Sequence, residues 1–184
     1  APNASLVVNT TANTFDGTCD ATNCSLRDAI AASNVLPTVG GLPNQITVPA
    51  GAYTLGVATS IEILKPVIVN GAGAALTTID VTSSTIASPG GIFDAKVALV
   101  LNGLAVTSTN TPASDVLASC TGHDPRAVTL LNVAATGLAG AVAECDTTLV
   151  SSVVTGPNAV IDPYAVAISN STVPFGAATI DPVR

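Results

Sequence analysis

A short motif recurs along this chain and constrains its fold more than any other feature. An aliphatic residue followed by a small polar one, each time inside a β-rich run, occurs at Val69-Asn70, Leu101-Asn102, Leu131-Asn132, Val150-Ser151 and Ile168-Ser169. The steps of 32, 30, 19 and 18 residues fit a unit of about 19 residues that carries two insertions. Repeats of this length indicate an architecture in which each unit packs only on its neighbours.

The repeat predicts an all-β fold, a parallel β-helix (β-solenoid) whose short strands stack about 4.8 Å apart in successive coils. We expect one domain over residues 1–184, with an N-terminal strand and helix cap in 1–45 and coils in 46–184. Inward Leu, Ile and Val then align in stacks, and an aromatic content of 3% suits a narrow interior. The polar residues of the motif are expected to share one corner, where they bond turn backbone groups: Asn70, Asn102, Asn132, Ser151 and Ser169. A β-sandwich of hairpins is the alternative fold.

One segment near the N-terminus has a helical pattern. Residues 24–33 begin with Ser25 as a good N-cap, carry Asp28 at the capping-box distance, and place Leu26, Ala29 and Ile30 on one face. We expect this helix to end near Asn34, before Pro37 and a pair of glycines. Because it is short and apolar on one side, it needs a flat hydrophobic surface to pack on.

The same region carries a family resemblance. Asp16-Gly17-Thr18-Cys19, Cys24-Ser25-Leu26-Arg27-Asp28-Ala29-Ile30 and Ile46-Thr47-Val48-Pro49-Ala50-Gly51-Ala52-Tyr53-Thr54-Leu55 resemble the N-terminal region of secreted bacterial and archaeal right-handed parallel β-helix proteins of the CSLREA type. The resemblance covers roughly the first third of the chain, and Asp28 stands where that family usually has Glu. It implies a right-handed β-helix, export from the cell, and a helix that caps the first coil with Leu26, Ala29 and Ile30. It implies no catalytic activity.

The cysteines and the first residues point to a secreted protein. Cys19, Cys24, Cys120 and Cys145 are an even number, and two disulfides in an oxidising compartment are the simplest interpretation. Cys19 and Cys24 are close enough for a local bridge, and Cys120 and Cys145 would close a longer loop, although three pairings are open. The chain opens with Ala1-Pro2-Asn3 rather than Met, as expected of a mature chain whose signal peptide has been removed. We therefore expect an extracellular or cell-surface location.

The composition disfavours some classes of binding partner. Five Lys and Arg against twelve Asp and Glu, for a net charge of −7, disfavour nucleic acid and anionic membranes. Gly, Asn, Ser, Thr and Pro interrupt the apolar runs, so no segment is expected to insert into a membrane. Only 9% of residues are charged while 48% are hydrophobic, so apolar surface is buried either in an efficient core or against other chains.

The two ends of the chain suggest self-assembly. Ile161-Asp162-Pro163 recurs as Ile180-Asp181-Pro182, so a new coil is expected to begin just before Arg184 and to remain open. The strand-like run from Leu6 to Thr11 is a candidate to complete that coil in a neighbouring molecule, head to tail. The expected interface comprises Leu6, Val7, Val8, Asn9, Ile180, Asp181, Pro182 and Val183. Two alternatives are that the strand pairs with the first coil of its own chain, and that the chain is a fragment of a longer solenoid.

Enzymatic and metal chemistry find weaker support in the sequence. Carbohydrate-cleaving β-helix enzymes need clustered acids, whereas Asp residues here are scattered; Asp124, Asp162 and Asp181 would stack but precede Pro, which favours turns. His123 and Asp124 could form a hydrolytic triad with a nearby Ser, but no nucleophile-elbow pattern supports one. A Ca²⁺ site could be formed by Asp16, Asp20 and Asn23, although this stretch is also typical of an ordinary turn. A zinc site would need closer cysteines and more histidine. We assign no catalytic, cofactor or metal residues and expect no cofactor.

The expected function follows from these observations. The favoured interpretation is a secreted, non-enzymatic structural protein whose partner is itself, assembling head to tail into a filament or surface layer. An adhesin or glycan-binding module of a cell-surface protein is the first alternative, and a polysaccharide lyase or hydrolase the second. Four sequons mark candidate N-glycosylation sites, Asn3, Asn9, Asn23 and Asn170.

Overall fold

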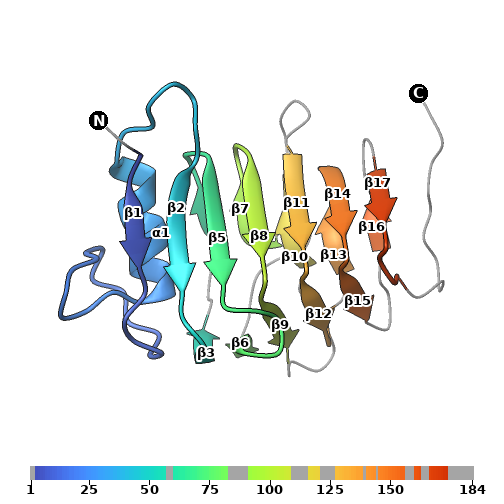
Figure 1. Ribbon diagram of the computed structural model, residues 1–184, viewed down its shortest axis with the longest axis horizontal. Coiled ribbons are helices and arrows are strands. Elements are labelled where there is room, and N and C mark those ends of the chain that lie inside the picture. The colour runs from blue at the N-terminus through green and yellow to red at the C-terminus, as the bar shows by residue number, and fades with distance from the viewer. Residues whose placement is uncertain are drawn as a thin grey trace.

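Parallel sheets make up most of this protein. The computed structural model describes residues 3–56, 60–82, 91–108, 116–120, 127–138, 140–143, 145–155, 160–162 and 166–173, and every structural statement below concerns these residues. They form three parallel sheets and one α-helix, α1 (Leu26–Val35) (Figure 1). The expectation of an all-β fold of parallel sheets with a short N-terminal helix is confirmed. No helix in the described ranges is long and apolar enough to cross a membrane.

The strands fall into three sets. Sheet A, with seven strands, runs in the order β1 (Ser5–Val7), β2 (Asn44–Val48), β5 (Val67–Gly71), β8 (Leu99–Asn102), β11 (Ala127–Leu131), β14 (Asp146–Val150) and β17 (Val166–Ser169). Sheet B contains β3 (Gly51–Gly56), β6 (Thr77–Thr82), β9 (Ala105–Ser108), β12 (Ala134–Thr136) and β15 (Val153–Thr155). Sheet C contains β4 (Ile61–Ile63), β7 (Gly91–Ala95), β10 (Val116–Ser119), β13 (Gly140–Ala143) and β16 (Val160–Asp162).

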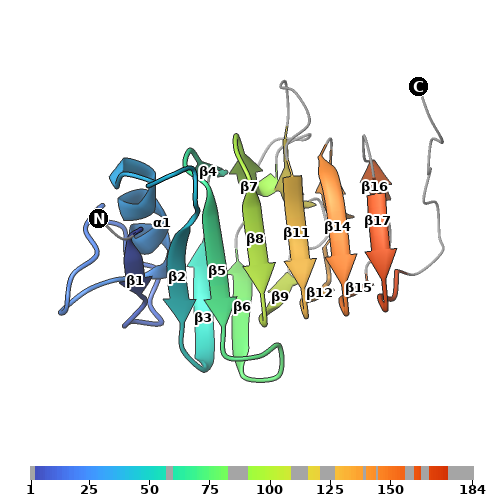
Figure 2. The ribbon, with the colours of Figure 1, turned by 45° about the horizontal axis from the view of Figure 1, so that its top comes forward.

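The chain visits these sheets in a fixed order. From β2 onward, successive strands belong to sheets A, B and C in turn, until β17 returns to sheet A. Within each sheet every strand pairs in parallel with the strand of the next round, for example β5 with β8 and β8 with β11. Figure 2 shows the result for sheet A, whose strands lie side by side from β1 at one end to β17 at the other.

One row of aliphatic side chains runs the whole length of sheet A. The pairing registers align Leu6, Ile46, Val69, Leu101, Leu130, Leu149 and Ile168. The five inner members are at most 1% exposed, whereas Leu6 is half-buried and Ile168 is 48% exposed. We call this row the sheet A column; it is continuous, and no strand in the described part of the chain pairs beyond β1 or β17.

The expected polar corner is wrong by one residue for two of its five members, Asn132 and Ser151, whereas Asn70, Asn102 and Ser169 share one register row. Asn70 and Asn102 do pair, and the Asn102 amide donates to the Asn70 side-chain oxygen at 3.0 Å. However, Asn102 then aligns with Leu131, and not with Asn132. Asn132, Ser151 and Asn170 lie one step further on, with φ of 52°, 50° and 48°, beside Gly103 with φ of 62°.

The physical reason for the shift is backbone conformation. Sheet A strands end where the chain turns into the left-handed region, which Gly and Asn tolerate better than other residues. Three of these turn residues donate their N–H to the next round: Gly103 to Leu131 O at 2.9 Å, Asn132 to Val150 O at 2.9 Å, and Ser151 to Ser169 O at 3.0 Å. The motif therefore mixes strand-end asparagines with turn asparagines.

The helix forms as the sequence predicts. Ser25 is its N-cap, and the capping box with Asp28 is complete in both directions. Leu26, Ala29 and Ile30 are buried, and α1 packs against β1, β2 and β4. In Figure 1 the helix lies at the β1 end of the molecule.

Replacing Asn132 tests the turn assignment. Asn132 is exposed, so a substitution there reports mainly on the backbone. We expect Asn132→Val to lower the free energy of unfolding by about 1–2 kcal/mol, because a β-branched residue resists a positive φ. Asn132→Gly should cost less than this. Equal losses for both variants in denaturant unfolding would contradict a turn role.

Candidate functional site

The β1 end of the molecule is largely closed by polar contacts. At the edge of sheet B, Thr54 donates its N–H to Thr11 O at 3.2 Å, and the Asn13 amide donates to Gly56 O at 3.1 Å. At the edge of sheet C, the Asn34 amide donates to Glu62 O at 2.8 Å and accepts from Leu64 N at 2.8 Å. Asn34 thus stands in for a missing strand beside β4, which satisfies backbone groups that would otherwise be free.

Sheet A differs because its edge is a real strand. Gln45 donates its N–H to Ala4 O at 2.8 Å, and Val8 donates to Thr47 O at 2.9 Å. Backbone groups alternate in direction along a strand, so the N–H and C=O of Ser5 and Val7 point away from β2. The outer edge of β1 therefore offers a row of backbone groups for pairing.

This arrangement corrects the expectation of an unpaired N-terminal strand. Leu6 and Val7 pair with β2 of the same chain, Val8 is 1% exposed, and Asn9 bonds the Cys24 N–H and the Asp20 carbonyl. The alternative of pairing within the chain is the one observed, because the strand extends the in-register sheet A column. Within β1, Ser5 and Val7 keep backbone groups for an outside partner, and the Val7 side chain is 54% exposed.

The opposite end exposes the core. Ile168 on β17 is 48% exposed, whereas Leu149, its register partner on β14, is fully buried. Ser169 O accepts from Ser151 N, so the backbone N–H and C=O of Ser169 point back toward β14. Because direction alternates along a strand, the N–H and C=O of Ile168 point away from β14. Ile180, Asp181, Pro182 and Val183 lie outside the described residues.

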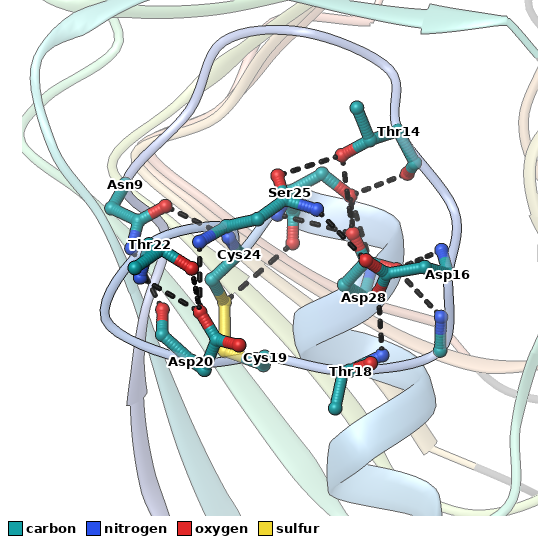
Figure 3. Close-up of a disulfide and its surroundings, with 12 residues drawn as sticks. Asn9, Thr14, Asp16, Thr18, Cys19, Asp20, Thr22, Cys24, Ser25 and Asp28 are labelled. Carbon is teal, nitrogen blue, oxygen red and sulfur yellow. Dashed lines mark hydrogen bonds between the residues drawn. A yellow bond between two sulfur atoms is a disulfide. The ribbon is translucent and has the colours of Figure 1, made fainter.

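Two disulfides brace the molecule. Cys19 is bonded to Cys24, and Cys120 is bonded to Cys145. The first closes a loop beside the N-cap of α1 (Figure 3), and the second joins the end of β10 to the start of β14. Disulfides persist in oxidising compartments, so the protein belongs to such an environment.

Asp28 organises the loop that carries the first disulfide. Its carboxylate is fully buried and accepts from Asp16 N and Gly17 N at 3.0 Å, from Thr14 Oγ1 at 3.2 Å and from Ser25 Oγ at 2.8 Å. Figure 3 shows these donors around it. These hydrogen bonds, rather than a cation, stabilise the buried Asp28 carboxylate, and they bind residues 14–17 to the start of α1.

The candidate Ca²⁺ ligands serve as turn acceptors in the same loop. Asp16 accepts from Thr18 N at 2.8 Å and from the Asn23 amide at 3.1 Å, and Asp20 accepts from Thr22 N at 2.7 Å. The bond from the Thr18 backbone is the main reason that the pKa of Asp16 is lowered, and the Thr22 hydroxyl does most to lower the pKa of Asp20. Within the described ranges, no group of three or more His, Cys, Asp and Glu could hold a metal ion.

The candidate catalytic acids do not converge. His123 and Asp124 lie outside the described residues. Asp80 lies on sheet B and Asp94 on sheet C, while Asp162 belongs to β16. Asp94 and Asp162 occupy one register row of sheet C, with β10 and β13 between them, whereas Asp80 lies on a different sheet.

The four sequons differ in structural setting. The side-chain amides of Asn3, Asn9 and Asn23 donate to Pro43 O, Asp20 O and Asp16 Oδ2. Asn170 is exposed directly after β17, and its side chain has no hydrogen bond within the described part of the chain. Asn170 is therefore the sequon with most room for a glycan.

Comparison of the sequence with protein-family models, with curated proteins and with solved structures found no match. The features that bear on function are therefore the β1 and β17 ends of sheet A and the surface of the molecule. Sequence reasoning singled out Leu6 and Val7 but missed Asn34 as an edge cap and Ile168 as an exposed member of the sheet A column. Ile168 was identifiable as the last aliphatic member of the repeat.

Asp28→Asn tests the organisation of the loop. We expect it to lower the free energy of unfolding by about 2–4 kcal/mol, since an amide nitrogen would face N–H and O–H donors in a buried site. Glu62→Gln, at an exposed side chain, should change stability by less than about 0.5 kcal/mol. If the two variants unfold at the same urea concentration, the carboxylate does not have this role.

Proposed function

We propose that this chain is a secreted, non-enzymatic right-handed parallel β-helix that assembles head to tail with copies of itself into an extracellular filament or surface layer. The fixed A, B, C order of parallel strands supports a β-helix, and parallel connections of this kind are almost always right-handed. The two disulfides support export. The sheet A column, with Leu6 open at one end and Ile168 at the other, carries the assembly proposal.

The backbone pattern at the two ends is complementary. Gln45, Thr47 and Ser169, which flank column residues, use their backbone groups to bond the strand on the β1 side. Because backbone direction alternates along a strand, the column residues of sheet A direct their N–H and C=O groups toward the β17 end. At β17 the backbone N–H and C=O of Ile168 likewise point away from β14. At β1 the groups of Ser5 and Val7 point outward to receive them. If Leu6 of one molecule aligns with Ile168 of the next, the hydrogen-bond pattern of sheet A continues across the junction without a shift.

The side chains at the junction also fit. Leu6 would cover Ile168, as Ile46 covers Leu6 within the chain, and so would extend the aliphatic column. Further exposed apolar residues lie near β1, in a segment that Val39 ties to Asn3: Val35, Val39 and Leu42 are 82%, 40% and 62% exposed. Contacts of this head-to-tail kind do not close on themselves, so they build open polymers.

Two end variants and one control test the proposal. Val7→Pro removes an N–H that points away from β2, so it should spare the fold and block edge pairing. Ile168→Asp places a charge at the open end of the column. Leu76→Asp makes the same kind of change at a side chain that is 59% exposed and lies between β5 and β6.

We expect the unmodified protein and Leu76→Asp to form filaments in electron micrographs and light scattering. Val7→Pro and Ile168→Asp should raise the concentration needed for assembly at least about tenfold while keeping the β-sheet circular dichroism spectrum. A wild-type protein that remains monomeric, or end variants that assemble normally, would refute head-to-tail growth through sheet A.

A further inference from the structure

A groove of about 490 Å³ lies between α1 and sheet C, lined by residues of both. Its walls include Phe15 and Arg27 from the N-terminal region and Glu62 and Asp94 from β4 and β7, and Ile61 contributes apolar surface. The volume lies within the range of small-molecule sites. None of these side chains belongs to the sheet A column.

The acidic wall of the groove has unused acceptor capacity. Glu62 and Asp94 are register partners on adjacent strands, so their side chains emerge on the same face. Asp94 Oδ2 contacts Lys96 Nζ at 2.7 Å, while Asp94 Oδ1 is buried and has no hydrogen-bond partner within the described residues. A buried acceptor without a donor is costly, and this oxygen has almost no exposed surface. Asp94 therefore gains if its side chain turns toward a hydroxyl or N–H that a ligand brings into the groove.

The opposite wall combines an aromatic ring with a cation. Phe15 is 62% exposed, in a chain with only three Phe and two Tyr. The Arg27 guanidinium lies 4.9 Å from the centre of the Phe15 ring and donates through Nη1 to Gly56 O at 2.9 Å. The ring is thus held in place by the cation, and Arg27 keeps other N–H groups for an acceptor.

We propose that this groove binds a neutral glycan. Two carboxylates, Glu62 and Asp94, are balanced by Lys96 and Arg27, so the site has no excess charge to select an ionic ligand. A sugar ring offers hydroxyl donors to the carboxylates, hydroxyl acceptors to Arg27, and C–H groups to the exposed Phe15 ring. The inference is independent of head-to-tail assembly, and it gives a structural protein a means of holding a polysaccharide.

Calorimetric titration of the full chain with neutral tetrasaccharides of β-1,4-linked glucose, xylose and mannose tests the proposal. We expect one of them to bind, and Asp94→Ala and Phe15→Ala each to weaken that binding at least about tenfold. Asp80→Ala, which removes a carboxylate on sheet B that accepts from Thr107, is the matched control and should bind as the unmodified chain does. Circular dichroism confirms that each variant is folded.

Two results would overturn the assignment. Binding that survives both Asp94→Ala and Phe15→Ala would place the glycan elsewhere on the molecule. The absence of binding to all three tetrasaccharides at millimolar concentration would remove the neutral-glycan interpretation. Because the sheet A column is untouched in these variants, their filaments should match those of the unmodified chain whatever the titration shows.

Discussion

In-register stacking of aliphatic side chains along sheet A is the interaction on which the rest of the structure depends. Each strand of this sheet has three to five residues, too short to be stable alone, and each gains its stability from the strands on either side. A one-residue slip would turn Leu101 or Leu130 to the surface, so the register is strongly specified. The turns at Gly103, Asn132, Ser151 and Asn170 maintain this register, because they end each sheet A strand at the same position and direct the chain toward sheet B.

The ends of such a stack are chemically unequal. At the β1 end, α1 covers the interior, and Thr11, Asn13 and Asn34 satisfy the edges of sheets B and C. The buried Asp28 carboxylate and the Cys19–Cys24 disulfide hold this cap together. At the β17 end, Ile168 remains half exposed. Among the described residues, the outer edge of β1 is the strand edge that the cap leaves unpaired, and the proposed head-to-tail assembly uses that edge.

Much of the fold could be predicted from the sequence, for identifiable reasons. The spacing of aliphatic residues indicated stacked parallel strands, and Ser25 with Asp28 marked the helix because capping chemistry is local. The polar corner was misplaced because Asn102 at a strand end and Asn132 in a turn look alike until φ is known. The pairing of β1 with β2 and the groove beside Asp94 depend on contacts between distant residues, which periodicity does not encode.

Cysteine cross-linking across the junction tests the central claim most directly. The proposed junction would place Leu6 of one molecule beside Ile168 of the next, within the Cα separation of about 4.4–6.8 Å that a disulfide spans. Under mild oxidation the Leu6→Cys, Ile168→Cys double variant should give a ladder of covalent oligomers on a non-reducing gel, and each single variant should give none beyond dimer. A double variant that remains monomeric under conditions where the unmodified chain forms filaments would contradict a continuous sheet A column.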